Sequence, residues 1–227
     1  MRPENLTGFR STLPNFESRY PVALTIAAVI VLLAVLPERI RLVPLWVAEV
    51  IGAAVLVPVV AVGLTHAKRL WLRVESIIVT TFFVLMAFGT LANLANLIDA
   101  MVHRAKEVSG LQLLGSSVAV WVTNVLMFSL LYWQLDRGGP EPRASGAGRS
   151  PDWLFPQESA PPHIVAAGWH PTFIDYLYLS YSTATAFSTT DVMPLTSRAK
   201  LLMMSESGIS LMTIVIVAAR AINILGS

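Results

Sequence analysis

The chain has 227 residues, of which 55% are hydrophobic and only 13% are charged, and its formal net charge is +2. This composition excludes a soluble domain of this size, because such a domain needs much more polar surface to face water. We therefore expect an integral membrane protein that contacts lipid. The small basic excess lies between the apolar runs, where bases anchor helices to headgroups, so nucleic acid is not an expected partner.

The sequence also lacks the residues that common active sites need. There is no cysteine, which excludes disulfides, thiolate metal sites and cysteine nucleophiles. No nucleotide-binding, hydrolase or metalloprotease motif is present. The histidines lie at or beyond the ends of the apolar runs: His66, His103, His163 and His170. We expect no enzymatic activity, no cofactor and no metal site.

Five apolar runs approach or reach the length needed to cross a hydrocarbon core about 30 Å thick. They occupy residues 22–36, 45–64, 77–98, 111–135 and 201–225. A polar leader, 1–21, precedes them, and residues 22–110 form a three-span N-terminal bundle. Ser117 and Asn124 in the fourth run are typical of hydrogen-bonded packing between membrane helices. These runs and the shorter one described below predict an all-α membrane protein with five transmembrane helices and one re-entrant half-helix.

A segment rich in Pro, Gly and Ser, residues 136–171, follows the fourth run. Its composition predicts a long aqueous loop that is partly flexible. Trp153, Phe155 and Trp169 in this segment can either anchor it at the membrane surface or pack over neighbouring helices. Anchoring is the commoner reason for aromatic residues at such positions, and we expect it here.

The next apolar segment, 172–187, is too short to span a membrane. About fifteen residues form roughly 22 Å of helix. The helix should start near Thr172, with Pro171 suited to its first turn and Asp175 complementing the positive end of its dipole. Its C-terminal end would then point partial negative charge at the membrane centre, where it can stabilise a dehydrating cation. The alternative is an ordinary short helix in a bundle.

A hydroxyl-rich segment connects this half-helix to the last run. The residues that could line an ion path are Thr185, Ala186, Phe187, Ser188, Thr189, Thr190 and Asp191. Hydroxyls and a ring of Asp191 carboxylates would suit a hydrated, cation-preferring path. Alternatively, runs of this kind are ordinary helix caps, and Thr196 or Ser197 could cap the final helix.

The last helix, 198–225, carries polar side chains on one face, and that face should point away from lipid. They are Glu206, Ser210, Thr213 and Arg220. We take the first three as pore-lining candidates, with Glu206 forming an acidic ring. The alternative is a bundle in which Glu206 pairs with a base from another span or subunit. Arg220, near the chain end, should snorkel to the interface.

The segment from Tyr176 to Pro194 resembles the pore module of tetrameric potassium-channel-like proteins. Asp191 and Pro194 match the closing Asp-x-x-Pro of the Thr-Val-Gly-Tyr-Gly-Asp-x-x-Pro filter, and Thr185 lies near its first threonines. Ser188 and Thr190 stand where that family has glycines. Because β-branched Thr190 does not readily adopt the left-handed backbone of such a filter, the resemblance implies weak selectivity. The chain also looks like a member of a bacterial membrane protein family with a degenerate filter.

The resemblance implies a pore-like module over residues 111–227, with outer helix 111–135, loop 136–171, half-helix 172–187, filter-like loop 185–197 and inner helix 198–225. Gly208 has the spacing of a hinge glycine. It further implies a homotetramer in a bacterial plasma (inner) membrane that passes monovalent cations. Two alternatives remain: a carrier with a mid-membrane site at the half-helix and Glu206, and a structural or partner-binding membrane protein that conducts nothing.

Overall fold

The computed structural model describes residues 20–35, 50, 53, 81, 89, 92, 94–96, 98–99, 110–144, 146–166, 168–186 and 191–225. Of these residues 77% are helical. Two helical stretches are long and apolar enough to cross a membrane, Leu114–Gly138 and Ser197–Ala219. They correspond to the fourth and fifth expected spans. The runs expected at 45–64 and 77–98 lie outside the described residues, apart from isolated positions.

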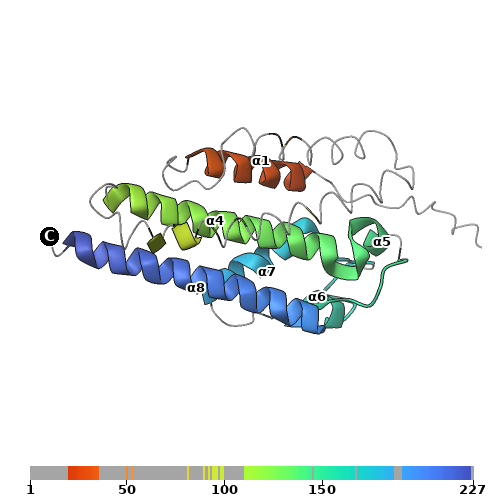
Figure 1. Ribbon diagram of the computed structural model, residues 1–227. Coiled ribbons are helices and arrows are strands. Elements are labelled where there is room, and N and C mark those ends of the chain that lie inside the picture. Colours follow the sequence, from red (N-terminus) through yellow and green to blue (C-terminus); the bar gives the residue numbers. More distant parts are fainter. Residues whose placement is uncertain are drawn as a thin grey trace, which may run out of the picture.

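Three helices form the centre of the described structure (Figure 1). Helix α4 (Gly110–Leu135) and helix α8 (Ser197–Leu225) lie side by side, and the shorter α7 (Phe173–Ala186) packs against both. Helix α1 (Tyr20–Val35) lies along α4 and buries Val22, Ile26 and Val29. The bounds of α4, α7 and α8 differ from the expected ones by one residue at most.

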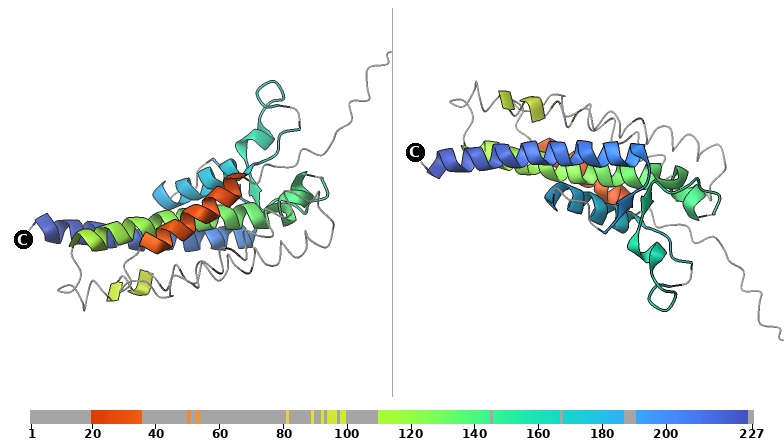
Figure 2. Two further views of the ribbon diagram at one scale, coloured as in Figure 1. Left: turned by 90° about the horizontal axis from the view of Figure 1, so that it is seen from above. Right: turned by 90° about the horizontal axis from the view of Figure 1, so that it is seen from below.

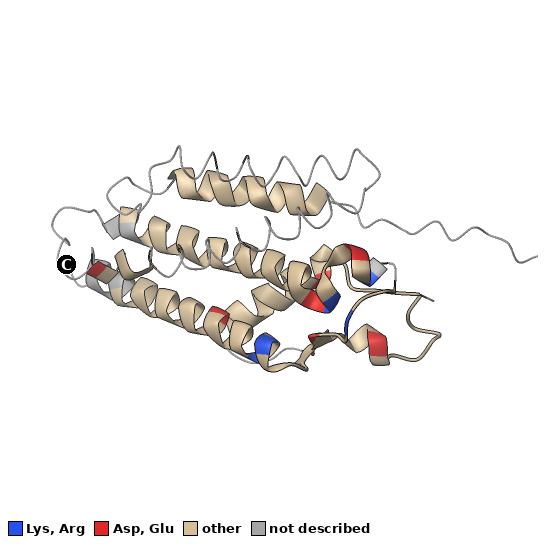
Figure 3. Ribbon diagram, turned by 45° about the vertical axis from the view of Figure 1, so that its right-hand side comes forward, with Lys and Arg blue, Asp and Glu red and all other residues tan. Residues whose placement is uncertain are grey.

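Short elements connect α4 to α7 at one end of the bundle. A 3-10 turn (Asp136–Gly138), α5 (Pro140–Ala144), β1 (Trp153–Leu154) and α6 (Pro156–Ser159) follow one another there. Gly138 and Gly139 have φ values of 86° and 110°, which glycine adopts readily. At these two residues the chain turns away from the axis of α4. We call this the loop end of the bundle. Among the described residues, charged positions gather at the loop end, whereas the long helices carry few beyond it (Figure 3).

The aromatic residues of the loop end are packed rather than surface-anchored. Trp153 and Phe155 are fully buried, and Trp169 packs edge-on against Phe155 with ring centroids 6.1 Å apart. Strand β1 pairs antiparallel with β2 (Met193–Pro194), so that Trp153 lies opposite Pro194. This pairing draws Trp153 under Tyr132 of α4, at a centroid distance of 4.8 Å. The expectation of membrane anchoring is therefore wrong for Trp153 and Phe155.

The path of the chain through α7 is re-entrant relative to the bundle (Figure 2). Helix α7 begins at the loop end and, with 14 residues, is about 21 Å long, whereas the 29 residues of α8 extend about 43 Å. After α7 the chain returns to the loop end, because β2 pairs there with β1 and Arg198 donates to the Leu135 carbonyl over 3.2 Å. The half-helix thus stops partway along α4 and α8.

Side chains cap the starts of both helices. Asp175 Oδ2 accepts from the backbone N–H of Thr172 at 2.7 Å and from the Thr172 hydroxyl at 2.8 Å. Helix α7 begins at the residue that follows Thr172. Pro171 precedes the helix instead of lying in its first turn. Thr196 Oγ1 accepts from the Ala199 N–H at 3.1 Å, which confirms Thr196 as the cap of α8.

Thr196 supports a test of this cap, because its hydroxyl also donates to Asp152 Oδ1 over 2.6 Å. Thr196→Ala removes both contacts and should lower the free energy of unfolding by about 1–2 kcal/mol. Thr196→Ser keeps the hydroxyl and should remain within about 0.5 kcal/mol of wild type. Unfolding in mild detergent, followed by circular dichroism, measures both. Equal stability of the two variants would contradict the assignment.

Candidate functional site: a half-helix held between two long helices

Helix α7 has a buried face and an exposed face. The buried side chains contact α4 and α8 and include Tyr176, Leu179, Ser180, Thr183 and Ala184. The exposed ones recur at helical spacing: Ile174, Tyr178, Tyr181 and Thr185. Tyr178 and Tyr181 are each more than half exposed, and Tyr181 packs edge-on against Trp121. The half-helix is therefore fixed on one side and open on the other.

A buried polar group joins the three helices. Glu206 of α8 is fully buried, with one carboxyl oxygen bonded to the hydroxyl of Tyr132 on α4 and the other to the hydroxyl of Ser180 on α7. Asn124 of α4 donates to Ser210 Oγ over 3.0 Å and to the Glu206 carbonyl over 3.3 Å. We call Glu206, Tyr132, Ser180, Asn124 and Ser210 the Glu206 junction. The expected hydrogen-bonding role of Asn124 is confirmed.

Two more contacts hold the second half of α7. Ser180 Oγ lies 2.7 Å from the Val125 carbonyl oxygen of α4. Ser207 of α8 donates to the carbonyl of Thr183, in the last turn of α7, over 3.2 Å. Carbonyls of a last helical turn have no partner within their own helix, so this bond satisfies one of them. Both long helices thus fix the position at which α7 ends.

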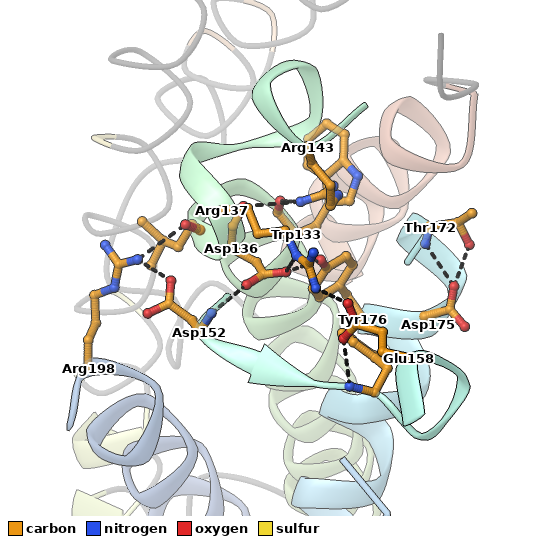
Figure 4. Close-up of polar contacts among 12 residues, drawn as sticks. Trp133, Asp136, Arg137, Arg143, Asp152, Glu158, Thr172, Asp175, Tyr176 and Arg198 are labelled. Carbon is orange, nitrogen blue, oxygen red and sulfur yellow. Dashed lines mark hydrogen bonds and ion pairs between the residues drawn. The ribbon is translucent and has the colours of Figure 1, made fainter. Parts of the chain in front are cut away.

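The first half of α7 is held at the loop end by Asp136, which is fully buried (Figure 4). Its Oδ2 accepts from the Tyr176 hydroxyl at 2.6 Å, and its Oδ1 accepts from the Asp152 N–H at 2.8 Å. Arg137 Nε lies 3.5 Å from the same carboxylate. Arg143 donates to the carbonyls of Trp133 and Asp136 and places its guanidinium 4.9 Å from the Tyr176 ring centroid.

Burial is the main reason that the pKa of Tyr176, which lies outside both candidate spans, is raised well above its ordinary value. The neighbouring Asp136 carboxylate acts in the same direction, and Arg143 opposes it. The phenol therefore stays protonated and remains a hydrogen-bond donor to Asp136 at neutral pH.

The segment that follows α7 is tied to the same end by Asp152. Arg198 forms an ion pair with Asp152 Oδ2, and Thr196 donates to Oδ1 (Figure 4). The Asp152 carbonyl accepts from the Leu195 N–H at 2.8 Å. Because Asp152 also donates its N–H to Asp136, these two carboxylates link the end of α4 to the start of α8.

The structure separates the predicted site residues into three groups. Thr185 is exposed, with its hydroxyl bonded to the Tyr181 carbonyl, Ala186 ends α7, and Asp191 is exposed where the chain returns. Residues 187–190 lie outside the described part of the chain, as does the side chain of Arg220. The pore-lining candidates form the third group and are fully buried: Glu206, Ser210 and Thr213.

The burial of this third group bears on its role. A side chain that lines a path between several copies of a chain has to be exposed when a single copy is considered by itself. Glu206 and Ser210 instead contact α4 or α7 of their own chain, and Thr213 is equally buried. Glu206 meets hydroxyls rather than the base that the bundle alternative expected. The placement of the three residues supports the bundle alternative for this face of α8. Gly208 is exposed, and open space lies where a Cβ would point.

Sequence reasoning missed Tyr132 and Ser180 as partners of Glu206. Tyr132 lies eight residues after Asn124 on α4, a spacing that places both on one helix face, and this was the available signal. Nothing in the pattern distinguished Ser180 from the other hydroxyls of the half-helix. Within the described residues, no group of three His, Asp or Glu could hold a metal ion.

Comparisons with known protein families, with curated proteins and with solved structures found no match.

Tyr176→Phe tests the anchor of the half-helix. It removes the donor to Asp136 and leaves a buried carboxylate oxygen with fewer partners, so the free energy of unfolding should fall by about 1–3 kcal/mol. Tyr178→Phe is the matched control: that side chain is 55% exposed on the same helix, and its loss of a hydroxyl should change stability by at most about 0.5 kcal/mol. Thermal unfolding of both variants in detergent provides the comparison, and similar losses would argue against the anchor.

Proposed function

We propose that this chain is an integral membrane protein whose α4, α7 and α8 surround a cation path together with the same helices of other copies, four copies being the expected number. The observation that carries the proposal is the re-entrant course of the chain. Helix α7 enters from the loop end, stops partway along α4 and α8, and the chain returns to the same end. Its C-terminal dipole then directs partial negative charge inward, where a partly dehydrated cation is stabilised.

The free surfaces of the chain support an arrangement of several copies. One half-helix cannot enclose a path, so closure requires symmetry. Helix α8 exposes an apolar stripe at helical spacing, on the side away from the Glu206 junction: Leu201, Met204, Gly208, Leu211, Met212 and Val215. In this arrangement the N-terminal spans lie outside the path, and the exposed residues of α7 and α8 meet other copies or the path itself.

The path would be weakly selective among monovalent cations. Ser188 and Thr190 replace the glycines of a potassium filter, and hydroxyls with Asp191 carboxylates suit hydrated cations. A carrier with a substrate site at Glu206 is less well supported. Both carboxyl oxygens of Glu206 already have partners, and the side chain is fully buried. A protein that assembles without conducting is the second outcome that the experiments below distinguish.

The subunit number is the first test. Native mass spectrometry in mild detergent should give a tetramer. A monomer or dimer would contradict the channel proposal, because neither can place enough half-helices around one axis.

Asp191 tests conduction directly, because it is an exposed residue of the filter-like loop. Asp191→Asn should reduce single-channel cation conductance several-fold at low salt, since a ring of carboxylates concentrates cations locally. The reduction should shrink at high salt, where the charges are screened. Asp191→Glu retains the charge and should conduct nearly as wild type. Planar-bilayer recording of purified protein measures both, and equal currents in the two variants would rule out the carboxylate ring.

Gly208→Ala separates a hinge from a passive position. Because there is open space where the Cβ would lie, the substitution should stabilise α8 within one chain by about 0.5–1 kcal/mol. If Gly208 bends during opening or lets copies approach closely, open probability or subunit number should nevertheless change. Gly115→Ala is the matched control, since Gly115 also lies in a long helix with open space around it. An unchanged channel with a more stable subunit would dismiss the hinge.

A further inference from the structure

The carboxyl group of Glu206 has no cationic partner among the described residues. Tyr132 faces it from α4 and Ser180 faces it from α7. Nearby, Asn124 of α4 donates to the Glu206 backbone carbonyl and to Ser210, one turn further along α8. None of these four side chains carries a positive charge at neutral pH, and Tyr132 is the one that titrates. An ionised carboxylate at this depth between apolar helices would lack the compensation that buried charges need.

The number of hydrogens available in the Glu206 junction shows which protonation state fits. The Ser180 hydroxyl carries one hydrogen but has two oxygen neighbours, Glu206 Oε1 and the Val125 carbonyl oxygen at 2.7 Å. A backbone carbonyl oxygen can only accept. If Glu206 were ionised, Ser180 could donate to one of these neighbours only. The other pair would consist of two oxygens in close contact with no hydrogen between them, which is repulsive.

A neutral Glu206 removes this conflict. With a proton on Oε1, Glu206 donates to Ser180 Oγ, Ser180 donates to the Val125 carbonyl, and Tyr132 donates to Oε2. Every hydroxyl then donates once, and each contact contains one hydrogen. Placing the proton on Oε2 fails, because it would compete with the Tyr132 hydrogen for the same contact and leave the Ser180 conflict in place.

We infer that Glu206 is held as a neutral carboxylic acid and acts as a proton-dependent positioning residue for the half-helix. Its proton completes a chain of hydrogen bonds from α8 through α7 to α4, which fixes α7 near the point where it ends. Removal of the proton at alkaline pH breaks one of these contacts and loosens α7 from α4 or α8. Under the proposed function, the half-helix is the wall of the ion path, so alkaline pH would also alter conduction.

The inference itself is tested without recording any current. Infrared difference spectroscopy of wild type against Glu206→Gln, at neutral pH in detergent, should show a C=O stretching band of an un-ionised carboxylic acid that the variant lacks. Ser180→Ala removes the acceptor of the Glu206 proton and should shift this band to higher frequency. That shift decides the question should Glu206→Gln fail to fold. A difference spectrum with carboxylate bands alone would overturn the inference.

The pH dependence of unfolding provides the second readout. A glutamine at position 206 accepts from Tyr132 and donates to Ser180, as the neutral acid does, and it has no proton to release on unfolding. Glu206→Gln should therefore melt at or above the wild-type temperature at neutral pH. Glu206→Ala removes all these bonds and should melt about 10 °C lower. Wild type should lose stability as pH rises, and Glu206→Gln should lose distinctly less. If Glu206→Gln were as unstable as Glu206→Ala and as pH-sensitive as wild type, the proton would have no positioning role.

These results separate the two proposals. Failure of the protein to conduct leaves the infrared band and the melting profiles unaffected. Conversely, an ionised Glu206 in a conducting tetramer would refute the neutral acid and leave the channel proposal standing.

Discussion

A helix that ends among other helices leaves carbonyl groups without partners in its last turn, and the described structure is arranged around this constraint. Helix α7 ends partway along α4 and α8. On the side that packs against these two helices, water cannot solvate its last carbonyl groups. Ser207 accordingly donates to the Thr183 carbonyl, and Ser180 connects α7 to both long helices. Hydroxyl groups serve here because they are small enough to lie between closely packed helices and can both donate and accept.

The two ends of α7 use carboxyl groups in different ways. At the loop end, Asp136 and Asp152 have arginines nearby together with backbone N–H or hydroxyl donors, so ionised carboxylates are well compensated there. In the middle of the bundle, Glu206 has only hydroxyl partners. The cost of burying a charge is therefore met at one end by opposite charge and avoided at the other by keeping the proton. This difference explains why the charged residues gather at the loop end in Figure 3.

The sequence predicted the lengths of α4, α7 and α8 because apolar run length is a local property. Thr196 was also accessible, since a hydroxyl residue directly before a helix is the usual cap. The packing of Trp153 and Phe155 was not accessible. It depends on the pairing of β1 with β2, two short segments forty residues apart with no pattern of their own. The partners of Glu206 were missed for a related reason: reasoning from charge seeks a base, and this carboxyl is satisfied by neutral hydroxyls from two other helices.

The burial of Glu206 also limits where negative charge can act on an ion. Beyond the first turn of α8, the face that remains open is apolar apart from Ser205 and Gly208, and the hydroxyl of Ser205 is hydrogen-bonded to the Leu201 carbonyl of its own helix. A path lined by this face would attract cations only weakly along its length. The C-terminal end of the α7 dipole and Asp191 of the filter-like loop would then supply nearly all of the electrostatic attraction. Ion discrimination in such an arrangement depends on the loop, while the Glu206 junction acts indirectly, by fixing where the half-helix ends.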